Sequence, residues 1–329
     1  MPGLNTQLST EAQLFFYDQL RLIGKSENLD LFLYTRGGQT DSIWPLVNLF
    51  REYSKVFSVL IPFRAHSAGT LLSLGANKII MSEAAELSPI DPTTGNQFNP
   101  LDETNNKRRG ISVEDVTSYI DLAKDTTKVG LQDSDQILEV FKRLSEEVHP
   151  LALGNVNRVH NQIKILAEKL LQLHLKEEKE KAKITKIVDQ LTRSLYSHTH
   201  AINRREAKQI LGSDLIVEAE PSLQKLIWEL YEDYAETLNL RKTLCQDEVL
   251  EQAKESSEFS FIGAFIESEN RSFVYKAKCE ITVSSKIPKG INIQVPQGQV
   301  IPRIIEGFPL QIQDIKVLSF GWEENTNGD

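Results

Sequence analysis

The residue best placed for covalent chemistry is Ser67, in the run Arg-Ala-His-Ser-Ala-Gly-Thr at residues 64–70. It follows a predicted buried strand at residues 56–61 and begins a predicted helix at residues 67–74. Its small neighbours leave the hydroxyl accessible. The first turn of a helix offers unpaired N–H groups and a partial positive charge, which suit an anionic intermediate. The pattern therefore favours a serine nucleophile.

A second feature points to the same chemistry, because Gly37 and Gly38 end the preceding predicted strand at residues 31–34. Their backbone N–H groups can point to the same edge of the sheet as Ser67. Two such donors would form an oxyanion hole, in which each donor contributes about 3 kcal/mol to acyl transfer. The alternative is that Ser67 only caps its helix and the glycines only make a turn, since the sequence lacks the Gly-x-Ser-x-Gly elbow.

The elements that must position these residues alternate in type along the first third of the chain. Short apolar runs at residues 31–34, 56–61 and 78–81 predict buried strands, and a helix follows each of the first two. This alternation is typical of a parallel α/β sheet, with right-handed crossovers that place both helices on one side. Ligands of such sheets bind at the carboxyl ends of the strands, where residues 35–42 and 62–67 lie.

The rest of the chain has a different pattern. Residues 134–195 are predicted to be mostly helical. From about Glu258 apolar residues alternate with polar ones, which predicts a hairpin followed by strands at residues 291–295 and 310–320, in a β unit that ends at Gly321. We therefore expect a first domain at residues 1–245 and a second at residues 246–329, made of a helical linker and a small β-rich unit.

Composition narrows the class of protein. The chain has 329 residues, with 37 Lys and Arg against 46 Asp and Glu, so its net charge is −9. This charge argues against a nucleic-acid partner bound by bulk electrostatics. The two cysteines, Cys245 and Cys279, cannot form a disulfide framework or a thiolate metal site by themselves. No signal peptide, membrane span or phosphate-binding loop is recognisable, so we expect a cytoplasmic protein without a metal or cofactor.

Three motifs give the chain a family resemblance. They are Tyr-Thr-Arg-Gly-Gly at residues 34–38, Ala-His-Ser-Ala-Gly-Thr at 65–70 and Ser-Pro-Ile-Asp-Pro at 88–92. In this order and spacing they resemble the Clp protease/crotonase superfamily, and more narrowly the serine dehydrogenase proteinase family, relatives of signal peptide peptidase A. The resemblance covers about residues 14–217, with dense matches only in 31–92. It implies a Clp/crotonase-type ββα spiral with a helical extension.

The resemblance also implies site residues. Ser67 would be the nucleophile, and the N–H groups of Gly38 or Gly37 and of Ala68 would stabilise the oxyanion. The substrate would be a peptide or protein, and members of the superfamily commonly form homo-oligomers. Arg36 replaces the proline usual in this family and either binds a substrate carboxylate or pairs with a surface acid.

The sequence does not identify the general base of the site. Clp protease uses a histidine that follows the serine, but this sequence has none between His66 and His149. Relatives of signal peptide peptidase A use a lysine, which must be desolvated to lose its proton near neutral pH. Lys107, Lys124 and Lys128 are candidates, and an exposed surface amine is the alternative for each.

The sequence predicts the roles of other polar residues less specifically. His66 adjoins the nucleophile, but adjacent side chains diverge, so a structural or substrate-binding role is favoured over that of the base. Asp91, between two prolines, either orients a base or braces its loop. His198 and His200 can approach from a later segment, with structural roles as the default.

These features lead to one functional prediction and two alternatives. The prediction is an ATP-independent serine peptidase or amidase with a Ser67 nucleophile, a backbone oxyanion hole and a lysine base. The first alternative is a catalytically inactive scaffold or binding module on the same fold, which the missing histidine and the Arg36 departure favour. A thioester-directed enzyme ranks last, because no adenine-binding signature is recognisable.

Overall fold

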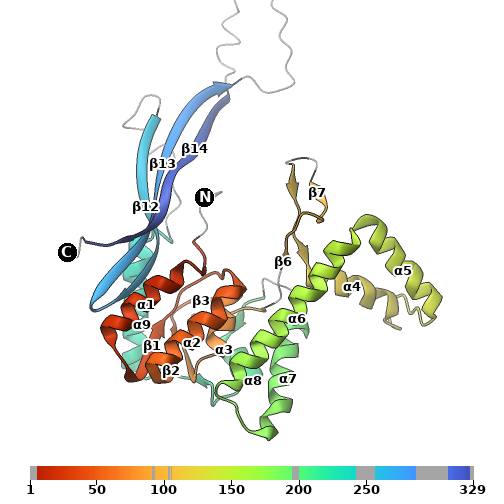
Figure 1. The fold of residues 1–329 in the computed structure, drawn as a ribbon, viewed down its shortest axis with the longest axis horizontal. Coiled ribbons are helices and arrows are strands. Elements are labelled where there is room, and N and C mark those ends of the chain that lie inside the picture. The colour runs from red at the N-terminus through yellow and green to blue at the C-terminus, as the bar shows by residue number, and fades with distance from the viewer. Residues whose placement is uncertain are drawn as a thin grey trace, which may run out of the picture. The chain divides into compact units, whose positions relative to one another are not determined.

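The computed structural model describes residues 6–90, 93–102, 104, 106–194, 200–241, 256–286 and 310–326. The chain divides into two compact units, one of Gln7–Tyr231 and the other of Met1–Thr6 with Glu232–Asp329. Figure 1 shows the helices and strands with the labels used below. The fold class is the expected mixed α/β arrangement.

The first unit is built on a parallel sheet with the strand order β1-β2-β4-β11. These strands are β1 (Ser26–Phe32), β2 (Ser54–Ile61), β4 (Lys78–Met81) and β11 (Ile216–Val217). Helix α2 (Ile43–Tyr53) connects β1 to β2 and packs against α1 (Ala12–Ile23) and α3 (Ala68–Leu74). Because α2 and α3 contact each other, the two crossover helices lie on one side of the sheet, as the sequence predicts.

The core of this unit lies between the sheet and these helices. Apolar side chains of β2, α2 and α3, such as Phe57, Leu46 and Leu71, are fully buried. Burial of this kind is the main favourable contribution to folding, at about 1.5–3 kcal/mol for each large apolar side chain. The carboxyl ends of β1 and β2 are therefore anchored on a rigid support.

A second, small sheet lies at those carboxyl ends and has the order β10-β5-β3. Its strands are β3 (Arg64–Ala65), β5 (Glu86–Leu87) and β10 (Ile202–Asn203). Strands β3 and β5 pair in parallel, and β10 pairs with β5 in the antiparallel direction. This sheet supports the segment that carries Ser67.

The segment after β5 contains short strand pairs and then helices. The strands are β6 (Thr93–Thr94), β7 (Leu101–Asp102), β8 (Lys107–Arg108) and β9 (Ile111–Ser112). The helices are α4 (Val113–Lys124), α5 (Ser134–Glu147), α6 (Pro150–Gln172), η2 (Glu178–Glu180), α7 (Lys181–Asp189) and the π-helical turn η3 (Gln190–Ser194). The helical prediction for residues 134–195 is thus confirmed over its described part. In Figure 1 the long helix α6 reaches from α3 to α4, and both of these helices contact it.

Two further helices follow, α8 (Arg204–Leu211) and α9 (Pro221–Thr237). The second unit contains an antiparallel sheet of β12 (Ser256–Ser268), β13 (Arg271–Lys286) and β14 (Leu310–Glu324). The predicted hairpin turn is confirmed, since Ser268 pairs with Arg271. Arg271 also forms two hydrogen bonds with the Glu324 carboxylate, both 2.8 Å long, which join β13 to β14. The predicted strand at residues 291–295 lies outside the described residues.

Candidate active site

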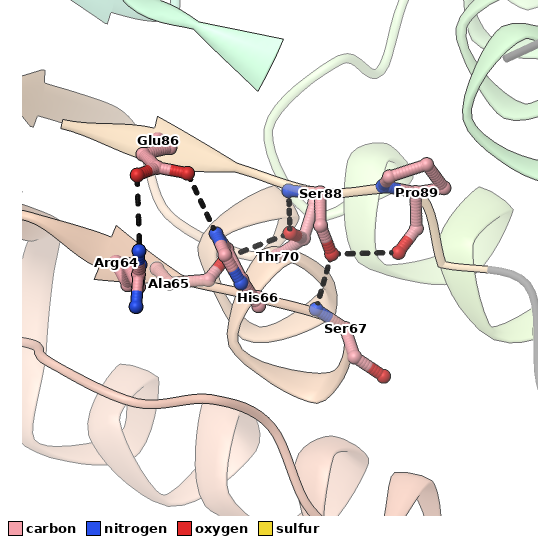
Figure 2. Close-up of polar contacts among 8 residues, drawn as sticks. All are labelled: Arg64, Ala65, His66, Ser67, Thr70, Glu86, Ser88 and Pro89. Atoms are coloured by element: carbon pink, nitrogen blue, oxygen red, sulfur yellow. Dashed lines mark hydrogen bonds and ion pairs between the residues drawn. The ribbon is translucent and has the colours of Figure 1, made fainter. Parts of the chain in front are cut away.

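Ser67 occupies a strained turn between β3 and α3. Its backbone has φ 51° and ψ −111°, a conformation that residues with a Cβ rarely adopt. A residue held in this way costs on the order of 1–3 kcal/mol and persists only where its surroundings enforce it. The Ser67 side chain is half-buried, and Figure 2 shows its Oγ pointing away from the other labelled side chains. The hydroxyl is therefore presented by a sharp strand-to-helix turn, the geometry of a nucleophile elbow.

A chain of hydrogen bonds from β5 and α3 enforces this turn (Figure 2). The Ser67 N–H donates to Ser88 Oγ at 2.7 Å, and the Ser88 hydroxyl donates to the Pro89 carbonyl at 2.9 Å. The Ser88 N–H donates to Thr70 Oγ1 at 3.0 Å, and the Thr70 hydroxyl donates to the Ala65 carbonyl at 2.8 Å. Ser88 and Thr70 are buried, so water does not compete for these bonds.

Gly37 lies directly against the Ser67 side chain. A Cβ at Gly37 would be 3.0 Å from Ser67 Cβ and 3.5 Å from its Oγ, and Gly37 has φ 118°, which favours glycine. The Gly37 N–H donates to Thr35 Oγ1 at 3.0 Å and is not available to a substrate. Of the predicted oxyanion donors, Gly37 therefore approaches Ser67 but has its N–H occupied.

The other two predicted donors, Gly38 and Ala68, are open. Within the part of the chain that the structure describes, neither N–H group donates a hydrogen bond. Ala68 is the first residue of α3, where a helix leaves its N–H groups unpaired. Ala68 follows Ser67, and Gly38 follows Gly37, which contacts the Ser67 side chain. Two open donors near the serine would suit the oxygen of a tetrahedral intermediate.

His66 faces away from this arrangement. Its Nε2 lies 3.3 Å from Glu86 Oε2, close enough for an ion pair but not aligned as a hydrogen bond, and Figure 2 shows the ring turned toward Glu86. Burial lowers the pKa of His66, partly offset by the Glu86 carboxylate, while the charges of Arg64 and Arg36 lower it further. In this position His66 contacts Glu86 rather than the Ser67 hydroxyl.

The remaining predicted site residues are dispersed. Lys124, the last residue of α4, and Lys107, on β8, are both exposed. Arg36 is exposed beside the glycine pair. Asp91 lies outside the described residues. Among the described residues, none donates a hydrogen bond to the Ser67 Oγ or accepts one from it.

His198 also lies outside the described residues, whereas His200 contacts the Glu206 carboxylate, with Nε2 2.9 Å from Oε1. No group of three His, Cys, Asp or Glu side chains suited to a metal ion occurs in the described ranges.

The structure adds residues that sequence reasoning missed. Leu8 pairs with the glycine segment as an isolated bridge, and Glu86 faces His66. Thr35 and Ser88 belong to the recognised motifs, but their hydrogen bonds to Gly37 and Ser67 were not predicted. No signal in the sequence marks Leu8, because a single backbone pairing leaves no pattern.

The fold and the site together define the class: a Clp-like α/β protein with an elbow-borne serine beside open N–H donors. Residues 16–133 match the family model of the ClpP-like SDH-type serine proteinases. The resemblance that the motifs indicate is therefore confirmed for this segment, which carries the glycine pair and Ser67.

Relatives and solved structures extend this comparison. The chain is 27% identical to Uncharacterized protein MJ0137 of Methanocaldococcus jannaschii over 68% of its own length and 65% of that protein's. It is 24% identical to Uncharacterized protein MJ1495 of the same organism over 72% of its length and 67% of that protein's. The chain thus spans about two thirds of the length of these relatives.

Two solved structures of variants of the 1510-N membrane-bound stomatin-specific protease are also similar. The variant in complex with a substrate peptide shares 15% identity, covers 67% of this chain and 74% of its own, and has a TM-score of 0.39. The second variant shares 13% identity, covers 67% of this chain and 79% of its own, and has a TM-score of 0.40. None of the described helices of the present chain is long and apolar enough to cross a membrane.

Proposed function

We propose that this chain is a serine peptidase or amidase that works without ATP and uses Ser67 as its nucleophile. The observation that carries the proposal is the strained Ser67 turn, whose hydroxyl is next in sequence to the open Ala68 N–H and lies beside Gly37, the neighbour of Gly38. The family match of residues 16–133 supports the same class of reaction.

The reaction follows from this placement. The Ser67 Oγ attacks the carbonyl carbon of a peptide bond while a base takes the hydroxyl proton. The carbonyl oxygen becomes an oxyanion that accepts hydrogen bonds from Gly38 and Ala68. The proton then passes to the leaving amine, the C–N bond breaks, and water hydrolyses the acyl-serine to regenerate Ser67.

We propose a lysine as the base, with Lys124, Lys107 and Lys128 as the candidates. Replacing the base with methionine removes the proton acceptor and should slow nucleophilic attack by about 10²-fold or more. The matched control is Lys142→Met on α5, another exposed lysine, whose ammonium pairs with Glu139 at 3.6 Å. If none of Lys124→Met, Lys107→Met and Lys128→Met slows the reaction more than the control does, the lysine assignment is wrong.

The experiment that tests the nucleophile is labelling with a fluorophosphonate probe, followed by peptide mapping. We expect phosphonylation of Ser67 in the wild-type chain and none in Ser67→Ala. Labelling at another residue, or none in a folded wild-type chain, would contradict the proposal.

The second candidate function is a catalytically inactive scaffold or binding module on the same fold. It is favoured by one observation, that among the described residues no base contacts the Ser67 Oγ. This function predicts a folded wild-type chain that does not react with the probe. It also predicts that the wild-type and Ser67→Ala chains bind peptides equally well, because the hydroxyl would then have no role in binding.

The proposal also covers the location, assembly and domain bounds of the enzyme. We propose a cytoplasmic homo-oligomer that acts on peptide or protein substrates without a cofactor. We further propose that the peptidase domain extends over residues 1–245, with residues 246–329 as a separate C-terminal region.

A further inference from the structure

Leu8, near the start of the first unit, pairs with the loop that contains Gly37 and Gly38. The Leu8 N–H donates to the Gly37 carbonyl at 3.1 Å, and the Gln39 N–H donates to the Leu8 carbonyl at 2.7 Å. These two bonds form an isolated parallel bridge between Leu8 and Gly38. The Leu8 backbone therefore forms hydrogen bonds with the residues on both sides of Gly38.

The Gly37 carbonyl accepts the Leu8 N–H, and it also accepts the Thr35 hydroxyl at 3.2 Å, so Leu8 and Thr35 together fix the orientation of this peptide plane. In a trans peptide the C=O of one residue and the N–H of the next point in opposite directions, and the described chain contains no cis peptide bond. Because the Gly37 carbonyl points to Leu8, the Gly38 N–H must point away from Leu8. This N–H is one of the two open donors near Ser67.

The peptide between Gly37 and Gly38 is easily rotated unless hydrogen bonds hold its orientation. Glycine populates positive and negative φ about equally, so the Gly37–Gly38 peptide can rotate at little steric cost. A rotated peptide would turn the Gly37 carbonyl, a hydrogen-bond acceptor, toward the position where an oxyanion develops, and would remove a donor from it.

The Leu8 backbone approaches Gly38 so closely that only glycine fits at this position. A Cβ at Gly38 would be 2.2 Å from the Leu8 carbonyl oxygen and 2.5 Å from the Leu8 nitrogen, distances that no side chain can have. The need for glycine at this position therefore arises from the close approach of Leu8. Leu8 itself is half-buried, with its side chain packed against the core.

We propose that Leu8 is a positioning residue whose backbone holds the Gly37–Gly38 peptide in the orientation that presents the Gly38 N–H to the oxyanion. This inference rests on the proposed function, because it assigns the Gly38 donor a role in attack by Ser67.

Leu8→Pro tests the inference, since proline has no N–H to donate to the Gly37 carbonyl. The measurement is the rate of Ser67 phosphonylation as a function of fluorophosphonate concentration. Loss of one oxyanion donor should lower the limiting rate constant by about 10²-fold. The probe concentration that gives half the limiting rate should stay the same, a split that general loosening of the fold would not produce.

Two matched controls separate the backbone from other effects. Leu8→Ala removes the side chain but keeps both hydrogen bonds, and we expect wild-type labelling. Gln7→Pro places a proline at an exposed neighbour whose N–H donates no hydrogen bond within the described residues, and it too should label normally.

A second variant covers the case in which Leu8→Pro fails to fold. Gln39 has φ −75°, which proline accepts, so Gln39→Pro removes the other hydrogen bond of the bridge with little strain at that residue. Its control is Gln39→Ala, which keeps the N–H. We expect slower labelling in Gln39→Pro only.

The outcomes distinguish this inference from the proposed function. A wild-type chain labelled at Ser67, with proline variants that are folded and label at the same rate, overturns the role of Leu8 and leaves the peptidase proposal intact. A folded wild-type chain without Ser67 labelling overturns both.

Discussion

At Ser67 the backbone conformation works against stability, because a φ of 51° is unfavourable for any residue with a Cβ. We predict that Ser67→Gly is more stable than Ser67→Ala by about 1 kcal/mol, since glycine relieves the strain and alanine retains it. Chemical denaturation of the two variants measures this difference in the free energy of unfolding. Equal stabilities would mean that the turn is not strained.

The Ser88 hydroxyl accepts the Ser67 N–H, so its removal should affect both stability and reactivity. We predict that Ser88→Ala lowers the free energy of unfolding by about 1–3 kcal/mol, the cost of leaving a buried donor unsatisfied, and also slows Ser67 phosphonylation. Denaturation and labelling kinetics measure the two effects.

The matched control for this prediction is Ser73→Ala. Ser73 is also buried, and its hydroxyl donates to the Gly69 carbonyl at 2.8 Å within the same helix that follows Ser67. It should lose some stability but keep the wild-type labelling rate. Equal labelling of both variants would exclude a positioning role for Ser88.

At the scale of single residues, sequence reasoning located the turn but not what holds it. The position of Ser67 at the start of a helix after a strand is confirmed. The elbow geometry forms although Ala65 stands where the familiar motif has glycine. The contact of Ser67 with Ser88 joins residues 21 apart and depends on tertiary proximity, which composition and spacing do not encode. The bond of Gly37 to Thr35 is local, but it depends on the loop conformation, which the motif alone does not specify. The roles of Lys107, Lys124, Asp91 and Arg36 remain predictions.

At the scale of elements, a hydrogen bond of His174, just after the end of α6, connects this helix to the end of α3. The Nε2 of this histidine lies 2.8 Å from the Leu74 carbonyl, and burial lowers the pKa of His174 below its ordinary value of 6.5. The neutral ring is therefore favoured in the folded state, while the unfolded state binds a proton more readily.

We predict that the free energy of unfolding decreases as the pH falls through 6.5 and levels off below the folded-state pKa. His66, whose pKa burial also lowers, contributes in the same direction. His174→Gln keeps a hydrogen-bond donor but does not titrate, so it should reduce this dependence. Denaturation at several pH values measures it, and an unchanged dependence would contradict the assignment.

Elements were predicted well where the hydrophobic pattern was long enough. The strand at residues 78–81 is confirmed as β4, and the helix after Ser67 as α3. Strand β1 begins at Ser26, earlier than predicted, because β1 is the edge strand of its sheet and tolerates polar residues in its first half. Strands β3, β5 and β10 have two residues each, too few to show a period.

At the scale of the whole molecule, α5 carries an apolar surface without a cover among the described residues. None of its residues is buried, and Leu138 and Phe141 are each 49% exposed. This surface is where the proposed contact between copies of this chain can be tested, because exposed apolar patches are frequent at protein interfaces.

We predict that Leu138→Glu shifts the assembly to smaller species in sedimentation velocity. Leu14→Glu, at a leucine of α1 that is 70% exposed, should leave the assembly unchanged. A wild-type chain that sediments as a monomer would contradict the assembly itself.

The small sheet has a consequence for synthesis on the ribosome. Strand β5, which leads into Ser88, is paired on its far side with β10, and Leu87 faces Ile202 there. Ser67 and the N–H groups of Gly38 and Ala68 leave the ribosome early, but the partner of their supporting strand emerges only after more than a hundred further residues. A nascent chain therefore completes the support of Ser67 late, when most of the first unit is already available to fold around it.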